Sequence, residues 1–131
     1  NPYFLSADID EMENKEIVSF VANYEGRDMN AIEEIAADMK QKFPEVEVFQ
    51  NKHFIDVAPK GVSKAEGIKT VMEKLGDIKK LYTIGDSYND IPMLQMTGDS
   101  FTFHSSPELV RENAGAVVSD FDECIEKYVL K

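Results

Sequence analysis

Cysteine, basic residues and long apolar runs are all scarce in this sequence. Cys124 is the single cysteine among 131 residues, so no internal disulfide can form, and this usage suits a reducing compartment. Lysine and arginine number 14 against 25 acidic residues, and the net charge of −11 argues against nucleic acid or an anionic membrane as partner. No apolar run approaches the roughly 20 residues that cross a membrane. We therefore expect a cytoplasmic protein that binds neither nucleic acid nor membranes.

The residues that are present suffice for a folded domain. With 43% hydrophobic residues the chain can bury a core, and its length matches one domain of ordinary size. Cys124 falls in a predicted C-terminal helix, where a packed thiol is expected. The chain begins at Asn1 and not at a methionine, so we expect it to be a piece of a longer protein.

The first half begins with a predicted strand and a predicted helix. Alternating apolar residues indicate a strand over residues 17–24. A helix follows that begins at Asp28 or Asn30 and stops before Pro44. The helix is predicted from apolar residues spaced three or four apart, which are Ile32, Ile35, Ala36, Met39 and Phe43.

A hairpin is predicted next, from residues 46–50 and 53–57 joined at Asn51-Lys52. His53 at its edge could act as a ligand or a base, although a lone histidine at a hairpin edge is more often a surface residue. Together these elements suit a small antiparallel sheet with a helix on it. We assign this unit to residues 1–58.

The second unit, residues 59–131, alternates helices and strands. Ser63-Lys64-Ala65-Glu66 is a capping-box pattern that opens a helix, and Gly76 ends it after Leu75. The later elements are predicted strands at 81–84, 100–103 and 116–118, and predicted helices at 90–96, from 106 and at 120–130. Such alternation predicts parallel strands covered by helices, and therefore an α/β fold for this part.

The loop Gly85-Asp86-Ser87-Tyr88-Asn89-Asp90 concentrates oxygen ligands just beyond a predicted buried strand. Asp86, Asn89 and Asp90 lie within five residues of one another, at the carboxyl edge where open parallel sheets bind ligands. Carboxylate and amide oxygens are suitable ligands for Mg²⁺. The same residues also fit a simple helix start, with Asn89 as N-cap and Asp90 in the first turn.

Lys64 is predicted in the first turn of its helix, where the helix dipole disfavours a cation. A nearby anion would hold it there. Because the helix that starts at residue 63 runs back along the sheet, its start is expected at the same edge as Asp86. A lysine and a metal-binding loop at one edge are typical of phosphoryl-transfer sites, where a cation and a metal share the negative charge of the phosphate. The alternative is an ordinary solvated lysine.

Two motifs in order resemble a known family. The segment Pro-Lys-Gly-Val-Ser-Lys at 59–64, followed by Gly-Asp-Ser-Tyr-Asn-Asp-Ile-Pro-Met-Leu at 85–94, is similar to the haloacid dehalogenase (HAD) superfamily. The similarity is specifically to Cof-like phosphatases that carry an α/β cap. It implies part of an α+β cap with antiparallel strands over residues 1–58. It implies the C-terminal half of a Rossmann-like core with parallel strands over residues 59–131.

The resemblance also implies an activity and residue roles. Such proteins are magnesium-dependent hydrolases that act on small phosphorylated metabolites through an aspartyl-phosphate. Lys64 would be the catalytic lysine that holds the nucleophile and the phosphate. Asp86 would bind Mg²⁺, with Asp90 supporting it directly or through water. Asn89 would orient Lys64 or the phosphate.

The sequence departs from the family pattern at three places. The nucleophile motif Asp-x-Asp-Gly-Thr is absent, because Asp8-Ile9-Asp10 is followed by Glu11-Met12, and the Ser or Thr of the second motif is missing. His104-Ser105-Ser106 stands where the family has Gly-Asn-Ala. We therefore expect no nucleophile in this chain and almost no activity from it alone. We also expect either a missing N-terminal segment or self-association through the edge of strand 81–84.

Two other functions fit the same residues. A non-catalytic protein of the same fold would bind a metal or a phosphorylated ligand. A receiver-like signalling module also combines a parallel sheet, an acidic metal site and a lysine. The receiver ranks last, because its lysine follows the acidic strand end, whereas Lys64 precedes Asp86.

Overall fold

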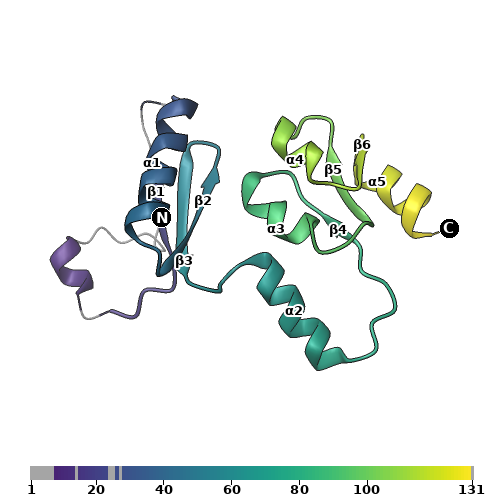
Figure 1. The fold of residues 1–131 in the computed structure, drawn as a ribbon, viewed down its shortest axis with the longest axis horizontal. Coiled ribbons are helices and arrows are strands. Elements are labelled where there is room, and N and C mark those ends of the chain that lie inside the picture. Colours follow the sequence, from purple (N-terminus) through teal and green to yellow (C-terminus); the bar gives the residue numbers. More distant parts are fainter. Residues whose placement is uncertain (1–7, 14, 24–25, 27, 131) are drawn as a thin grey trace, which may run out of the picture.

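The computed structural model describes residues 8–130 except 14, 24, 25 and 27. It contains two three-stranded sheets, one from each half of the chain (Figure 1). The first sheet is antiparallel and the second is parallel, as the sequence predicts. A short 3-10 helix, η1 (Ile9–Met12), precedes the first sheet.

The antiparallel sheet consists of β1 (Phe20–Asn23), β2 (Val46–Asn51) and β3 (Phe54–Pro59) in the order β1-β3-β2. Helix α1 (Met29–Lys42) covers one face of it. The core between helix and sheet is made by Ile32, Ala36, Val48 and Ile55, all buried. Ile32 and Ala36 are two of the apolar positions predicted for the helix, and Val48 and Ile55 lie in the two predicted hairpin strands, so a helix on a small antiparallel sheet is confirmed.

Local details of this unit differ from the sequence prediction. The strand predicted at 17–24 is four residues long, and its Phe20 is 55% exposed. Among the described residues β1 pairs with β3 alone, so it is an edge strand there. Ala22 is the residue through which it packs on the core. Asp28 is the N-cap of α1 and accepts a hydrogen bond from the Asn30 N–H at 3.0 Å. Tyr24 lies outside the described residues.

The parallel sheet has the order β4-β5-β6. Its strands are β4 (Thr83–Ile84), β5 (Ser100–Phe103) and β6 (Ala116–Val118). The helical elements around it are α2 (Lys64–Leu75), η2 (Tyr88–Asp90), α3 (Ile91–Leu94), α4 (Glu108–Glu112), α5 (Phe121–Cys124) and the π-helical turn η3 (Ile125–Val129). The predicted alternation of helices and parallel strands is therefore confirmed.

The core of the parallel sheet gathers on the side of the C-terminal helix. Phe101, Val118 and Cys124 are buried together there, and the rings of Phe101 and Tyr128 lie 4.9 Å apart between centroids. The thiol of Cys124 is 3% exposed, and burial raises its pKa. Cys124 thus behaves as a packed apolar residue with little thiolate at neutral pH.

Helix α2 has an apolar face that is largely uncovered. Val71 is 54% exposed and Leu75 is 71% exposed, while the helix packs against α3. A groove of about 600 Å³ runs beside it, lined chiefly by Ile68, Val71, Met72, Ile78, Leu81 and Met93. In the described part of the chain, β4 pairs with β5 alone, so its other edge is open. Association through this edge stays a prediction.

Close packing before β6 makes Gly115 a stability determinant. A β-carbon at Gly115 would lie 2.1 Å from the carbonyl oxygen of Gly98, a backbone atom that cannot step aside. We expect Gly115→Ala to lower the free energy of unfolding by about 3 kcal/mol, measured by urea denaturation. Gly67→Ala is the control, because nothing lies within 4 Å of that site in mid-helix. It should raise stability by about 0.5–1 kcal/mol. Equal urea midpoints for both variants would contradict the packing argument.

Candidate functional site

The site forms where the chain leaves β4 and turns into η2. Ser87 is the N-cap of η2 and makes a capping box with Asp90: each side chain accepts a hydrogen bond from the other residue's backbone N–H. The alternative interpretation that Asn89 caps this helix is therefore wrong. The turn begins two residues earlier, because Ser87 and Asp90 satisfy each other's backbone groups.

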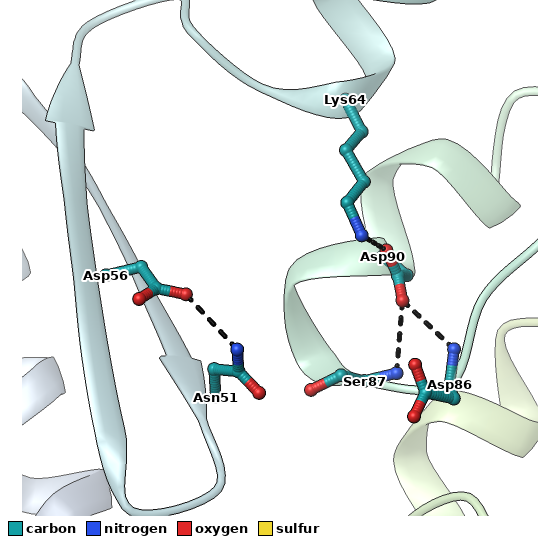
Figure 2. Close-up of polar contacts among 6 residues, drawn as sticks. All are labelled: Asn51, Asp56, Lys64, Asp86, Ser87 and Asp90. Carbon is teal, nitrogen blue, oxygen red and sulfur yellow. Dashed lines mark hydrogen bonds and ion pairs between the residues drawn. The ribbon is translucent and has the colours of Figure 1, made fainter. Parts of the chain in front are cut away.

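Asp90 is the centre of the hydrogen-bond network. It is 2% exposed, and its Oδ2 accepts hydrogen bonds from the backbone N–H of Asp86 at 3.0 Å and of Ser87 at 3.2 Å. Its Oδ1 accepts a hydrogen bond from Lys64 Nζ (Figure 2). Both carboxylate oxygens are therefore engaged. The carboxylate holds the loop in shape and ties it to the start of α2.

Gly85 makes room for this buried carboxylate. A β-carbon at Gly85 would lie 2.5 Å from Cβ and 2.8 Å from Oδ2 of Asp90. Contacts that short are not tolerated, so a larger residue at 85 would displace Asp90. A glycine is thus required at position 85, because the Asp90 side chain packs directly against its backbone.

Lys64 reaches the loop from the first turn of α2, as the topology argument predicts. Ser63 is the N-cap of the helix, and its Oγ accepts a hydrogen bond from the Glu66 N–H at 3.2 Å. The Lys64 side chain is 56% exposed and extends to Asp90 (Figure 2). The anion that holds this lysine at an unfavourable helix position is therefore the protein's own Asp90.

Asp86 lies on the other side of Asp90 from Lys64. It is exposed, and its carboxylate has no bonding partner among the described residues. The cavity beside it measures about 310 Å³ and is lined by Met29, Lys52, Asp86, Ser87, Tyr88, Ser105, Ser106 and Pro107. Lys64 instead borders the apolar groove of α2. The two predicted residues are thus joined through Asp90 and do not face each other across one pocket.

Three other residues that the sequence analysis named make no hydrogen bond to Lys64, Asp86 or Asp90. Asn89 makes no bond to Lys64, and its buried Oδ1 has no hydrogen-bond partner in the described part of the chain. His53 occupies the turn between β2 and β3, with a buried Nδ1 that likewise lacks a partner there. Ser106 of the stretch 104–106 anchors its loop, because its hydroxyl accepts hydrogen bonds from Thr102 Oγ1 at 2.8 Å and from the Phe103 N–H at 3.3 Å.

Asp8 and Asp10 lie far from these residues. Asp8 is the N-cap of η1 and Asp10 belongs to it. This short helix lies on the opposite side of the antiparallel sheet from β4 (Figure 1). The position of η1 agrees with the expectation that neither aspartate is the nucleophile.

The oxygen ligands of this loop can bind Mg²⁺ through one free carboxylate. Within the described residues, no three histidine, cysteine, aspartate or glutamate side chains converge. Asp90 has both oxygens occupied, whereas the Asp86 carboxylate is free. Protein Mg²⁺ sites commonly use one or two carboxylates and keep several waters. Asp86 is therefore the residue of this loop that could hold the ion directly.

Sequence comparison identifies the family. A family model described as haloacid dehalogenase-like hydrolase matches residues 3–124. The chain belongs to this family. YkrA of Bacillus subtilis is 33% identical over 114 residues, which are 82% of this chain and 44% of YkrA. The phosphoglycolate phosphatase of Natronomonas pharaonis is 32% identical over 94 residues, 64% of this chain and 42% of that enzyme.

Solved structures confirm the fold. The HAD subclass IIB sugar phosphatase BT4131 superposes with a TM-score of 0.76 at 23% identity, covering 93% of this chain and 47% of that one. The resemblance to the haloacid dehalogenase superfamily is thus confirmed by the family model, and the fold by the solved structure. This chain spans about half the length of the relatives named here. Across the described residues, every helix is too short or too polar to cross a bilayer.

Sequence reasoning missed two contributors to the site. Ser87 carries a local signal, because Ser-x-x-Asp is a variant of the capping-box pattern. Lys52 carries none, since it lies 34 positions before Asp86 and only packing brings it to the same cavity. Its backbone has φ of 55°, which the turn of the hairpin imposes.

Proposed function

We propose that this chain supplies the lysine and the metal-binding loop of a magnesium-dependent phosphatase for small phosphomonoesters. The observation that carries the proposal is the link from Lys64 through Asp90 to the backbone of Asp86. It sets a cation and a free carboxylate at the carboxyl edge of the parallel sheet. Family membership and the phosphatases among the relatives support the same reaction class.

Each residue has a role that follows from its contacts. Lys64 would place a positive charge against a phosphate oxygen, with Asp90 holding its ammonium group in position. Asp86 would hold Mg²⁺, which when bound neutralises part of the phosphate charge. Asn89 would offer its unpartnered oxygen to a group that enters with the ligand. The aspartate that forms the aspartyl-phosphate would come from outside this chain.

A binding protein of the same fold is the second candidate. It is favoured by the missing nucleophile motif and by the position of Asp8 and Asp10 on η1. Binding of phosphate with Mg²⁺ would be common to both candidates. Turnover of a phosphomonoester when a segment with the nucleophile motif is supplied would separate them.

The test is a ³¹P NMR titration of the purified chain with inorganic phosphate, with and without Mg²⁺. We expect Mg²⁺-dependent binding that weakens at least about tenfold in Lys64→Met, because a charge-assisted contact is lost. Asp86→Asn should remove the dependence on Mg²⁺. Lys69→Met is the matched control, since Lys69 lies on the same helix, is exposed and pairs with Glu66. Equal affinity with and without Mg²⁺ would refute the proposal.

A further inference from the structure

Gln50 is a polar residue at a core position of the antiparallel sheet. It lies two residues beyond Val48 on β2, so both side chains point to the face that α1 covers. Gln50 is 9% exposed, and its partner across β2 and β3 is Ile55, another core residue. Its Nε2 is buried and has no hydrogen-bond partner among the described residues. A buried donor without an acceptor is costly, so a ligand atom that accepts from Nε2 is favoured here.

Gln50 lines a cavity of about 740 Å³ between the two units of the chain. The other lining residues that bear polar side-chain groups come from α1, η2 and α4, and they are Glu33, Lys40, Tyr88, Glu108 and Glu112. Strand β2 and helix α4 both pack against η2, so residues of both units reach one cavity. Asp86 and Lys64 border other cavities, so this one is separate from the proposed phosphate site.

Charged side chains that are free to bind a ligand surround this cavity. Glu33, Glu108 and Glu112 are exposed, and within the described part of the chain their carboxylates make no hydrogen bond or ion pair. The ammonium group of Lys40 is exposed and unpaired in the same sense. The lining therefore offers three negative charges, one positive charge and the buried amide donor of Gln50.

We infer that this cavity binds a free amino acid with a cationic side chain, such as arginine or lysine. The α-ammonium group and the side-chain cation of that ligand pair with the glutamate carboxylates. Its own carboxylate accepts a hydrogen bond from Gln50 Nε2 and is attracted by Lys40. Two cations and one carboxylate on the ligand thus match the charges and the free donor of the lining. This site lies outside the proposed phosphatase chemistry and does not depend on it.

Other classes of ligand satisfy these groups less well. A polyamine carries cations alone and leaves Gln50 Nε2 without an acceptor. A phosphate or a dicarboxylate is repelled by the three glutamates. A neutral amino acid has one cationic group fewer to pair with them. Because the glutamates are exposed, each ion pair contributes little by itself. Selectivity therefore comes from the buried amide acting together with several ion pairs.

Isothermal titration calorimetry of the purified chain with arginine, lysine, citrulline and agmatine tests this inference. Citrulline has nearly the shape of arginine but an uncharged side chain, and agmatine is arginine without its carboxylate. At least one of the two basic amino acids should bind about fivefold more tightly than citrulline and about tenfold more tightly than agmatine. Gln50→Met removes the donor at similar size. It should weaken binding of that amino acid about tenfold and leave agmatine unchanged.

Glu33→Gln and Glu34→Gln form a matched pair, because these neighbours on α1 are both exposed and Glu33 lines the cavity whereas Glu34 does not. Glu33→Gln should weaken binding of the amino acid about fivefold, and Glu34→Gln should leave it unchanged. Equal losses in the two variants would reveal a general attraction to an acidic chain and would overturn the inference. Citrulline or agmatine binding as tightly as both basic amino acids would overturn it as well, as would an unchanged affinity in Gln50→Met.

Discussion

Purified chain incubated with p-nitrophenyl phosphate and Mg²⁺ is expected to hydrolyse it several orders of magnitude more slowly than a complete phosphatase. The chain lacks a recognisable nucleophile motif, and Asp8 and Asp10 lie on η1, remote from Lys64 and Asp86. Removing a covalent catalyst leaves only binding and electrostatic effects, and losses of that size are usual. The readout is release of p-nitrophenolate over hours at high protein concentration.

Two variants make this result interpretable. Asp8→Asn should leave the residual rate unchanged, because Asp8 is the N-cap of η1 and we expect it to take no part in the site. Asp86→Asn should abolish any residual Mg²⁺-dependent rate, because Asp86 carries the free carboxylate. Rapid Mg²⁺-dependent turnover that disappears in Asp8→Asn would show that the nucleophile had been placed wrongly.

Asp90→Ala is expected to cost about 3 kcal/mol of unfolding free energy, because buried donors lose their acceptor. The backbone N–H groups of Asp86 and Ser87 would lose Oδ2, and the capping box of η2 would be broken. Lys64 adds little to this cost, since its side chain is 56% exposed and screened by solvent. Urea denaturation followed by circular dichroism measures the change.

Two further substitutions separate the role of the buried carboxylate from a general effect of charge. Asp90→Asn retains an acceptor oxygen for one or both N–H groups and should recover part of the loss. Asp99→Ala is the control, because Asp99 is half-exposed and pairs with Lys80 at 3.5 Å across the surface. Its cost should stay below about 1 kcal/mol. A loss in Asp90→Ala no larger than in Asp99→Ala would refute the central position of Asp90.

The stability and binding experiments probe different consequences of one arrangement. Asp90 holds both the loop that carries Asp86 and the side chain of Lys64. If Asp90→Asn folds well but loses Mg²⁺-dependent phosphate binding, positioning of Lys64 is its contribution to function. The exposed carboxylate of Asp86 would then remain available, so the comparison with Asp86→Asn isolates the metal from the lysine.

Elements with a strong local pattern could be predicted from the amino-acid order. Helix α1 was predicted because Ile32 and Ala36 recur at helical spacing, and the hairpin because two apolar stretches flank Asn51-Lys52. The start of α2 was predicted because Ser63 can satisfy a free N–H of the first turn. Each of these features depends on hydrogen bonds or periodicity within a few residues. The placement of Lys64 and Asp86 at one sheet edge needed only the rule that parallel strands alternate with helices.

Features that depend on contacts between residues far apart in the sequence could not be predicted from local patterns. The apolar pattern of α2 predicts a buried face, yet Val71 and Leu75 are exposed, because periodicity shows that a face is apolar and not what covers it. Asp90, and not Asp86, receives Lys64, since the capping box with Ser87 turns the Asp90 carboxylate inward. Asn51 and Asp56 lie near the loop of Ser87 and Asp86 because β2 packs on η2 (Figure 2). Local order in the sequence therefore specifies which chemical groups are present, and long-range packing specifies which of them meet.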